Sequence, residues 1–143
     1  MSGFSSYTTN KLLNHIFSGT TYSTPEKYLA LLTSSSGLSS NANWSGNELS
    51  SSAVGYARLP LEDSVWTEST TGSVTTNADM MYTVAGSHWG EVSHVAIVDA
   101  PSGGNVIAWG ALANPVTGVE ETRNVETGDQ LVVRAGSLSI SIV

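Results

Sequence analysis

The sequence contains no cysteine, few charged residues and no long apolar run, and each absence excludes a class of protein. Without cysteine the chain has no disulfide framework, no thiolate nucleophile and no cysteine-based zinc site. No apolar run approaches the roughly 18 residues that a membrane-spanning helix needs, so we expect no membrane partner. The N-terminus lacks the basic start and apolar core of a signal peptide, which predicts a protein made in the cytoplasm.

Charged residues make up only 12% of the 143-residue chain, about half of the roughly 25% that is usual. Solubility depends instead on 23 serines and 15 threonines. Twelve acidic residues against five lysines and arginines give a net charge of −7. That balance argues against nucleic-acid binding, where basic side chains supply most of the affinity. The length predicts a single domain, 1–143, that folds without metal or disulfide support.

Short strand-like segments separated by turn residues dominate the sequence. Four of them lie in the last third, at 91–98, 105–112, 131–135 and 138–143. They are rich in β-branched residues and are bounded by turns rich in glycine and serine. Further short strands are predicted at 28–33, 55–61, 65–66, 73–76 and 80–84, with a polar loop over 118–123. The pattern predicts a mainly β, single-domain antiparallel β-sandwich or jelly-roll-like fold with one short N-terminal helix.

The helix is predicted over about residues 8–18. Thr8 or Thr9 can cap its first turn, and Gly19 follows at the position of a left-handed C-cap. Its apolar residues recur at helical spacing and are Leu12, Leu13, Ile16 and Phe17. A helix this short is not stable alone, so this stripe packs either on the domain's own core or on a neighbouring subunit.

A serine-rich segment over 34–52 contains one aromatic residue, Trp44. A loop of this length is uncommon in a compact domain and is usually functional or disordered. Its indole either folds back onto its own domain or anchors a partner. We take Trp44 as a candidate partner contact, together with three residues near the N-terminus: Phe4, Tyr7 and Lys11.

The sequence carries no catalytic, metal-binding or cofactor-binding motif. His88 and His94 are six positions apart, which fits neither the helical nor the strand spacing of a metal pair. The aspartates lie beside turn residues, where a carboxylate bonds its own backbone. Gly103 and Gly104 are not followed by the helix and lysine of a phosphate-binding loop. We therefore expect a protein that is not an enzyme and has no cofactor.

Several segments, in order along nearly the whole chain, carry a further signal. They are 7–17, 19–25, 28–33, 55–58, 89–99, 103–112, 128–129 and 135–140. These segments resemble a family of small virion structural proteins of tailed bacteriophages, whose members are often labelled tail fibre or minor tail proteins. The resemblance implies a non-enzymatic structural protein of the virion, assembled in the host cytoplasm, and it brings no catalytic residue.

A fibre proper is an elongated trimer with repeats or coiled-coil heptads, and this chain has neither. A compact knob suits a capsid decoration or cement protein that binds the major capsid protein in many copies, with avidity from multivalent contact. We expect this role ahead of the alternative, a tail-associated protein such as a tail fibre, minor tail or baseplate component. The short helix and the strand edges predict a homodimer or homotrimer.

Two alternatives come from other classes of protein. A carbohydrate-binding module would display a row of exposed tryptophans and tyrosines on one sheet face. A hydrolase would need a cleft with a pair of carboxylates whose pKa values are tuned apart.

Overall fold

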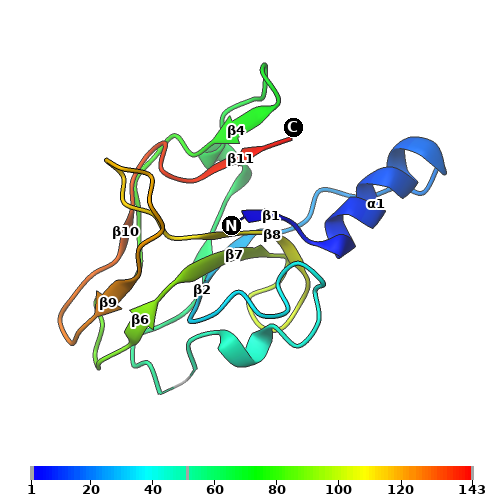
Figure 1. The fold of residues 1–143 in the computed structure, drawn as a ribbon. Helices are drawn as coiled ribbons and strands as arrows, with labels where there is room; N and C mark the ends of the chain where they lie inside the picture. The colour runs from blue at the N-terminus through cyan, green and yellow to red at the C-terminus, as the bar shows by residue number, and fades with distance from the viewer. Residues whose placement is uncertain (1, 51, 143) are drawn as a thin grey trace.

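The computed structural model describes residues 2–50 and 52–142 and shows a mainly β fold with one α-helix near the N-terminus (Figure 1). Met1, Ser51 and Val143 belong to the predicted domain, serine-rich segment and last strand, and lie outside the described residues. The predicted fold class is confirmed. In chain order the elements are β1 (Ser2–Phe4), α1 (Ser6–Phe17), β2 (Tyr28–Leu32), β3 (Leu59–Pro60), β4 (Ser73–Thr75), β5 (Met80–Met81), β6 (Gly90–Val92), β7 (His94–Val98), β8 (Val106–Ala111), β9 (Arg123–Val125), β10 (Val132–Val133) and β11 (Ser139–Ser141).

A five-stranded antiparallel sheet with the order β1-β8-β7-β2-β3 forms the centre of the fold. β2 and β7 pair along their whole lengths, from Tyr28 opposite Val98 to Leu32 opposite His94. The other described strands form three two-stranded sheets, β10-β5, β11-β4 and β6-β9. The sheets confirm the antiparallel β fold, whereas the jelly-roll topology is not confirmed among the described strands.

The central strand β2 is buried on both of its faces. Successive side chains of a strand point to opposite faces, so Leu29 and Leu31 join one core cluster while Ala30 and Leu32 join another. Each of these four residues is at most 1% exposed. A strand covered on both faces is apolar at every position, which explains the uninterrupted apolar run of 29–32.

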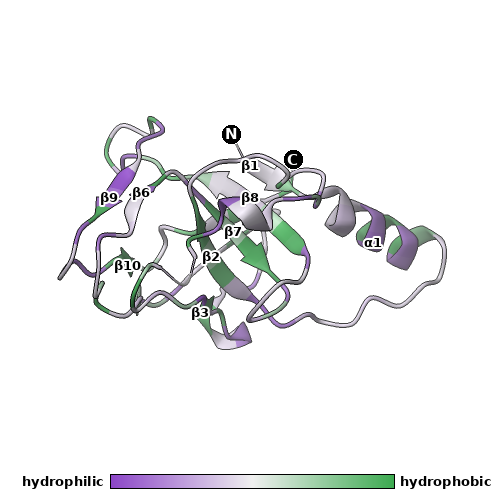
Figure 2. Ribbon diagram, turned by 90° about the horizontal axis from the view of Figure 1, so that it is seen from below, coloured by the Kyte–Doolittle hydropathy of each residue, from purple (hydrophilic) through white to green (hydrophobic). Residues whose placement is uncertain are grey.

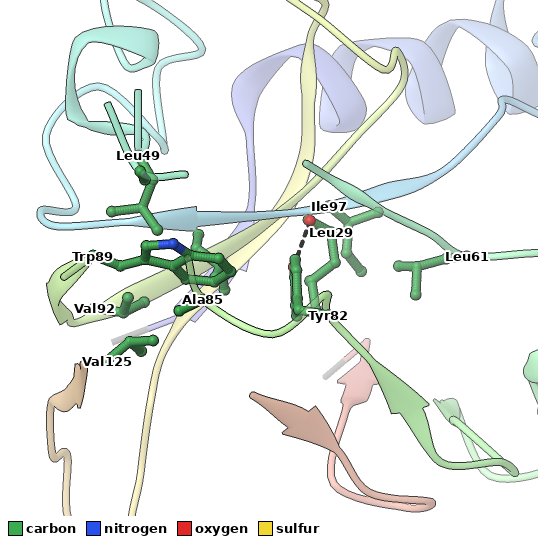
Figure 3. Packing of buried hydrophobic residues seen from close by; sticks show 11 residues of the cluster. Leu29, Leu49, Leu61, Tyr82, Ala85, Trp89, Val92, Ile97 and Val125 are labelled. Carbon is green, nitrogen blue, oxygen red and sulfur yellow. Dashed lines mark hydrogen bonds between the residues drawn. The ribbon is translucent and has the colours of Figure 1, made fainter. Parts of the chain in front are cut away.

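The segments that carry the small sheets cover the first face. Tyr82, Trp89 and Val125 belong to the same core cluster as Leu29 and Ile97 (Figure 3). The Tyr82 hydroxyl donates a hydrogen bond to the Leu29 carbonyl oxygen at 2.6 Å (Figure 3). Tyr82 is only 2% exposed, so this bond satisfies a hydroxyl whose burial would otherwise be costly. The tyrosine thereby ties the covering layer to the central strand.

The serine-rich segment covers the second face. Leu38 and Trp44 are 0% and 4% exposed, and both belong to the core cluster that contains Val98 and Val106 of the sheet. A 3-10 turn, Ser45–Asn47, follows the tryptophan. The predicted long loop is therefore a covering layer of the sheet, because Leu38 and Trp44 supply the apolar surface that the surrounding serines lack. Leu49, near the end of the same segment, is buried in the first cluster.

Some elements differ from those predicted. Segment 91–98 divides at Ser93 into β6 and β7, because β6 pairs with β9 while β7 pairs with β2 and β8. Segment 55–61 contains only the short β3, because its pairing with β2 is limited to Leu59 and Pro60. Segment 65–66 forms no strand, because the 3-10 turn Asp63–Val65 overlaps it.

Two strands were not foreseen at all. β1 is three residues long and includes a glycine, so its sequence shows no apolar alternation. β9 begins at Arg123, inside the polar segment 118–123 that we predicted to be a loop. Both strands depend on pairing with distant parts of the chain, β1 with β8 and β9 with β6.

Candidate interaction surface

The helix α1 begins two residues earlier than predicted, because Ser5 is the N-cap in place of Thr8 or Thr9. The Ser5 hydroxyl accepts a hydrogen bond from the Thr8 N–H at 3.3 Å, and it also donates to the Val106 carbonyl. Thr8 is buried, and its hydroxyl donates to the Ile107 carbonyl at 2.7 Å. Hydroxyl groups of the cap and of the first turn thus fix the start of the helix to β8.

Aromatic contacts hold the base of the helix as well. The Tyr7 and Tyr22 rings pack edge to face, with centroids 6.5 Å apart. The Lys11 ammonium lies 5.5 Å from the centroid of the Tyr7 ring, within cation–π range. Burial, and then the nearby Asp99 carboxylate, raise the pKa of Tyr7. The helix therefore leaves the sheet from a well-fixed base.

The far end of the helix is closed by backbone hydrogen bonds. The N–H groups of Ser18 and Thr20 both donate to the Asn14 carbonyl, at 3.0 and 3.1 Å. Gly19 lies between them with a left-handed φ of 69°, which glycine adopts without steric cost. Gly19 thus reverses the chain just beyond the helix end, as the sequence predicts.

The last two turns of α1 project away from the rest of the fold (Figures 1 and 2) and carry large exposed apolar side chains. Leu13, Ile16 and Phe17 are 54%, 65% and 79% exposed. Their i, i+3, i+4 spacing places them on one side of the helix. Within α1, all of which is described, Thr8 alone is buried, so the stripe does not cap the domain's own core. These three residues are termed the apolar tip.

The predicted partner contacts are divided between the helix base and the core. Tyr7 and Lys11 lie together at the base of α1, and Phe4 is half-buried in β1 opposite Ala108. Trp44 lies apart from them and is buried, so the structure shows the fold-back alternative for its indole. Partner contact by these four residues stays a prediction, and Trp44 is not displayed on the surface for it.

The N-terminal segment 1–25, termed the arm, differs in charge from the rest of the chain. It contains no aspartate or glutamate, and Lys11 is its one lysine or arginine. All twelve acidic residues lie in 26–143, together with the other four basic residues. One carboxylate from the rest of the chain, that of Asp99, nevertheless lies close enough to the arm to raise the pKa of Tyr7. The apolar tip lies on the part of the sequence that carries no carboxylate side chain.

A polar cluster around Glu48 is a second candidate site. Arg58 donates to the Glu48 carboxylate through Nε and Nη2, each at 2.8 Å, and the Tyr56 hydroxyl donates to it at 2.5 Å. The Arg58 Nη1 donates to the carbonyls of Ala100 and Gly103 at 2.6 and 2.8 Å. Burial, and then the bond to Glu48, raise the pKa of Tyr56. These charged and hydroxyl groups pair with one another inside the chain, which makes the cluster a structural clamp.

Three of the tryptophans bear on the carbohydrate-binding alternative. Trp44, Trp89 and Trp109 are each at most 9% exposed, so they do not form the aromatic row of a carbohydrate-binding face. In the part of the chain that the structure describes, no three histidine, aspartate or glutamate residues are grouped to hold a metal ion. None of the described helices has the length and apolar character to cross a membrane.

Comparison with known proteins gives one extensive match. A family model described as "Podophage GP4 fiber I protein gp80" matches residues 3–141, which include both the arm and the β-sheets. No curated protein matches the chain. The match confirms the resemblance to virion structural proteins that the sequence carries. Because it spans nearly the whole length, this chain belongs to the podophage GP4 fiber I protein gp80 family.

Proposed function

We propose that this chain is a tail-associated structural protein of a podophage virion, acting as a component of a fibre. The observation that carries the proposal is the match of residues 3–141 to a family described as a podophage fibre protein. From the sequence alone we expected capsid decoration ahead of a tail role. The family description favours the tail-associated alternative, since it names a fibre and not a capsid protein.

The shape of the chain indicates how it serves such a fibre. Its strands are short, and they gather around one five-stranded sheet, with α1 at one end and β6, β9 and β10 at the other (Figures 1 and 2). A single compact unit of this kind does not span a fibre by itself. The proposal is therefore that the chain is one module of a larger assembly and works through contacts with other virion proteins.

Self-association as a dimer or trimer is part of the proposal. The edges of the five-stranded sheet are β1 and β3, whose outer backbone groups are available for strand pairing. Light scattering of the purified chain measures its mass in solution. A strictly monomeric mass in solution, together with isolated copies on the virion, would contradict self-association.

Immunogold electron microscopy of purified virions tests the location. Antibodies raised against the full chain are expected to place gold particles at the tail. Virions grown from a phage with a nonsense mutation in the gene for this chain serve as the unlabelled control. Gold spread evenly over the capsid shell would overturn the tail assignment and support decoration of the capsid.

A further inference from the structure

Residues 2–8 hold the arm on the central sheet. β1 pairs with β8, from Ser2 opposite Gly110 to Phe4 opposite Ala108. The hydroxyl groups of the helix cap and of the first turn then donate to the carbonyls of residues 106 and 107, on the same strand. One short segment at the start of the arm is therefore its docking element, and β8 is the docking site.

The remainder of the arm buries little on the copy to which it belongs. Residues 13–21 are all exposed, and so are Ser23 and Thr24. Tyr22 packs against the Tyr7 ring within the arm itself, and its N–H donates to His15 Nδ1 at 3.1 Å. Ordering the backbone costs about 1–2 kcal/mol per residue. The chain thus runs out along the helix and returns to β2 with little burial on its own sheets to offset that cost.

The link between the helix and β2 is long enough to let the arm dock elsewhere. Residues 18–27, all of which are described, form no helix or strand, and Pro25 restricts Thr24 to extended geometry. Ten extended residues span up to roughly 33 Å, and the 12-residue helix adds about 18 Å. A compact domain of this length has a radius of gyration of about 15 Å. The docking element can therefore reach β8 of an adjacent copy.

Docking on a second copy reproduces the contacts of docking within one chain. Because β8 is identical in the two copies, the same strand pairing and the same hydroxyl-to-carbonyl bonds form, and only the path of the link changes. Exchange of an identical element is a low-cost route to an oligomer. Copies that are held side by side in a fibre also meet at a high effective concentration, which favours contacts between them.

We propose that copies of this chain exchange their arms, so that β1 and the start of α1 of each copy dock on β8 of a neighbouring copy. The β8 site of one copy is then completed by Ser5, Thr8 and β1 of another. This inference rests on the self-association in the proposed function and adds the contact that produces it. A reciprocal exchange closes as a dimer, and a cyclic exchange closes as a trimer.

Because the chain contains no cysteine, disulfide trapping tests the exchange directly. A Cβ atom at Gly110 would lie 3.3 Å from the Ser2 Cβ, close to the roughly 3.5–4.5 Å that a disulfide requires. The single variants Ser2→Cys and Gly110→Cys are mixed in urea, refolded together and oxidised. Neither can form this disulfide within one chain, so a covalent heterodimer on a non-reducing gel requires arm exchange.

A matched control measures random collision between thiols. Ser2→Cys is mixed with Glu62→Cys, because Glu62 is exposed and follows β3, at the edge of the sheet opposite β1. We expect the heterodimer with Gly110→Cys to exceed this control by roughly 10-fold or more, since docked thiols meet at the high effective concentration of a bound pair.

A second pair tests the exchange without changing Gly110. Ser6 and Ser40 are exposed serines, and the Ser6 hydroxyl donates to the Ser40 carbonyl at 3.2 Å. Ser6→Cys mixed with Ser40→Cys and joined by a short bis-maleimide linker should also give a heterodimer well above the control. Yields at the control level in both pairs would overturn the exchange.

Two measurements keep this inference separate from the proposed function. A dimeric or trimeric mass by light scattering, with heterodimer yields at the control level, overturns arm exchange and leaves self-association in place. In the double variant Ser2→Cys with Gly110→Cys, arm exchange predicts disulfides between chains, whereas a disulfide closed within each chain overturns it. The position of the gold label on virions tests the tail location independently of both.

Discussion

Arg58 and Glu48 form a bidentate ion pair that links the serine-rich segment to the segment leading into β3. Their side chains are only 4% and 13% exposed. The Arg58 guanidinium also lies 5.4 Å from the centroid of the Trp44 ring, on the same segment as Glu48. The covering layer of the second sheet face is thus held by an apolar contact and by a largely buried charge pair.

Breaking this pair should be costly. We expect Arg58→Ala to lower the free energy of unfolding by about 3–5 kcal/mol, because it leaves the Glu48 carboxylate buried without its partner. Arg134→Ala is the matched control, since Arg134 and Asp79 form a 3.7 Å pair with side chains 76% and 54% exposed. Its loss should be at most about 1 kcal/mol. Urea denaturation measures both, and equal small losses would contradict the clamp.

The Tyr82 hydroxyl offers a test of the first sheet face. Tyr82→Phe should lower the free energy of unfolding by about 1–3 kcal/mol, because the Leu29 carbonyl loses a buried hydrogen-bond donor. Tyr28→Phe removes a hydroxyl that lies on the surface, 3.4 Å from the Glu26 carboxylate, and should leave stability nearly unchanged. Thermal and urea unfolding compare the two. A Tyr82→Phe variant as stable as wild type would show that the bond contributes nothing.

The turn between β7 and β8 contains two adjacent glycines that should respond differently to substitution. Gly103 and Gly104 have left-handed φ values of 63° and 80°, so alanine at either position costs roughly 1–2 kcal/mol. A Cβ atom at Gly104 would also lie 2.6 Å from Asp99 Oδ1 and 2.8 Å from Ala100 Cβ, whereas one at Gly103 meets nothing within 4 Å. Gly104→Ala should therefore be the less stable variant in urea denaturation. The reverse order would contradict this turn geometry.

Protonation of His94 should lower the stability of the fold in mild acid. Burial favours the neutral imidazole and lowers the pKa of His94 below its ordinary value of 6.5. Between the two values the unfolded chain binds more protons than the folded chain, so stability falls as the pH drops through 6.5. The fall levels off once the pH lies below the folded pKa. The thermal midpoint of wild type should therefore decrease more steeply over this range than that of His94→Asn. Identical slopes would contradict the prediction.

The sequence predicted the strands whose local pattern is strong and missed those that depend on distant partners. β2 and β8 fall within predicted segments. Both are continuous runs of apolar or β-branched residues bounded by turn residues, a pattern that is typical of strands. β1 has no such pattern, and it forms a strand because it pairs with β8. The division of 91–98 at Ser93 likewise depends on which strands lie on either side, and no local signal encodes that.

The candidate site was foreseen in part. The apolar stripe of α1 is visible in the sequence, and its two possible partners, the domain's own core and a neighbouring subunit, were both open. Sequence could not show that β8 receives only the start of the helix, because that depends on hydrogen bonds from Ser5 and Thr8 to residues about 100 positions away. The burial of Trp44 was open for the same reason. Only the packing of Trp44 on the far face of the sheet decides between its two predicted roles.

Cryo-electron microscopy of intact virions, with the tail reconstructed separately from the capsid, would decide between the two locations. The proposed tail role predicts density for this fold at the tail, in contact with other virion proteins. Density for this fold at regular positions over the capsid lattice, with none at the tail, would contradict that role.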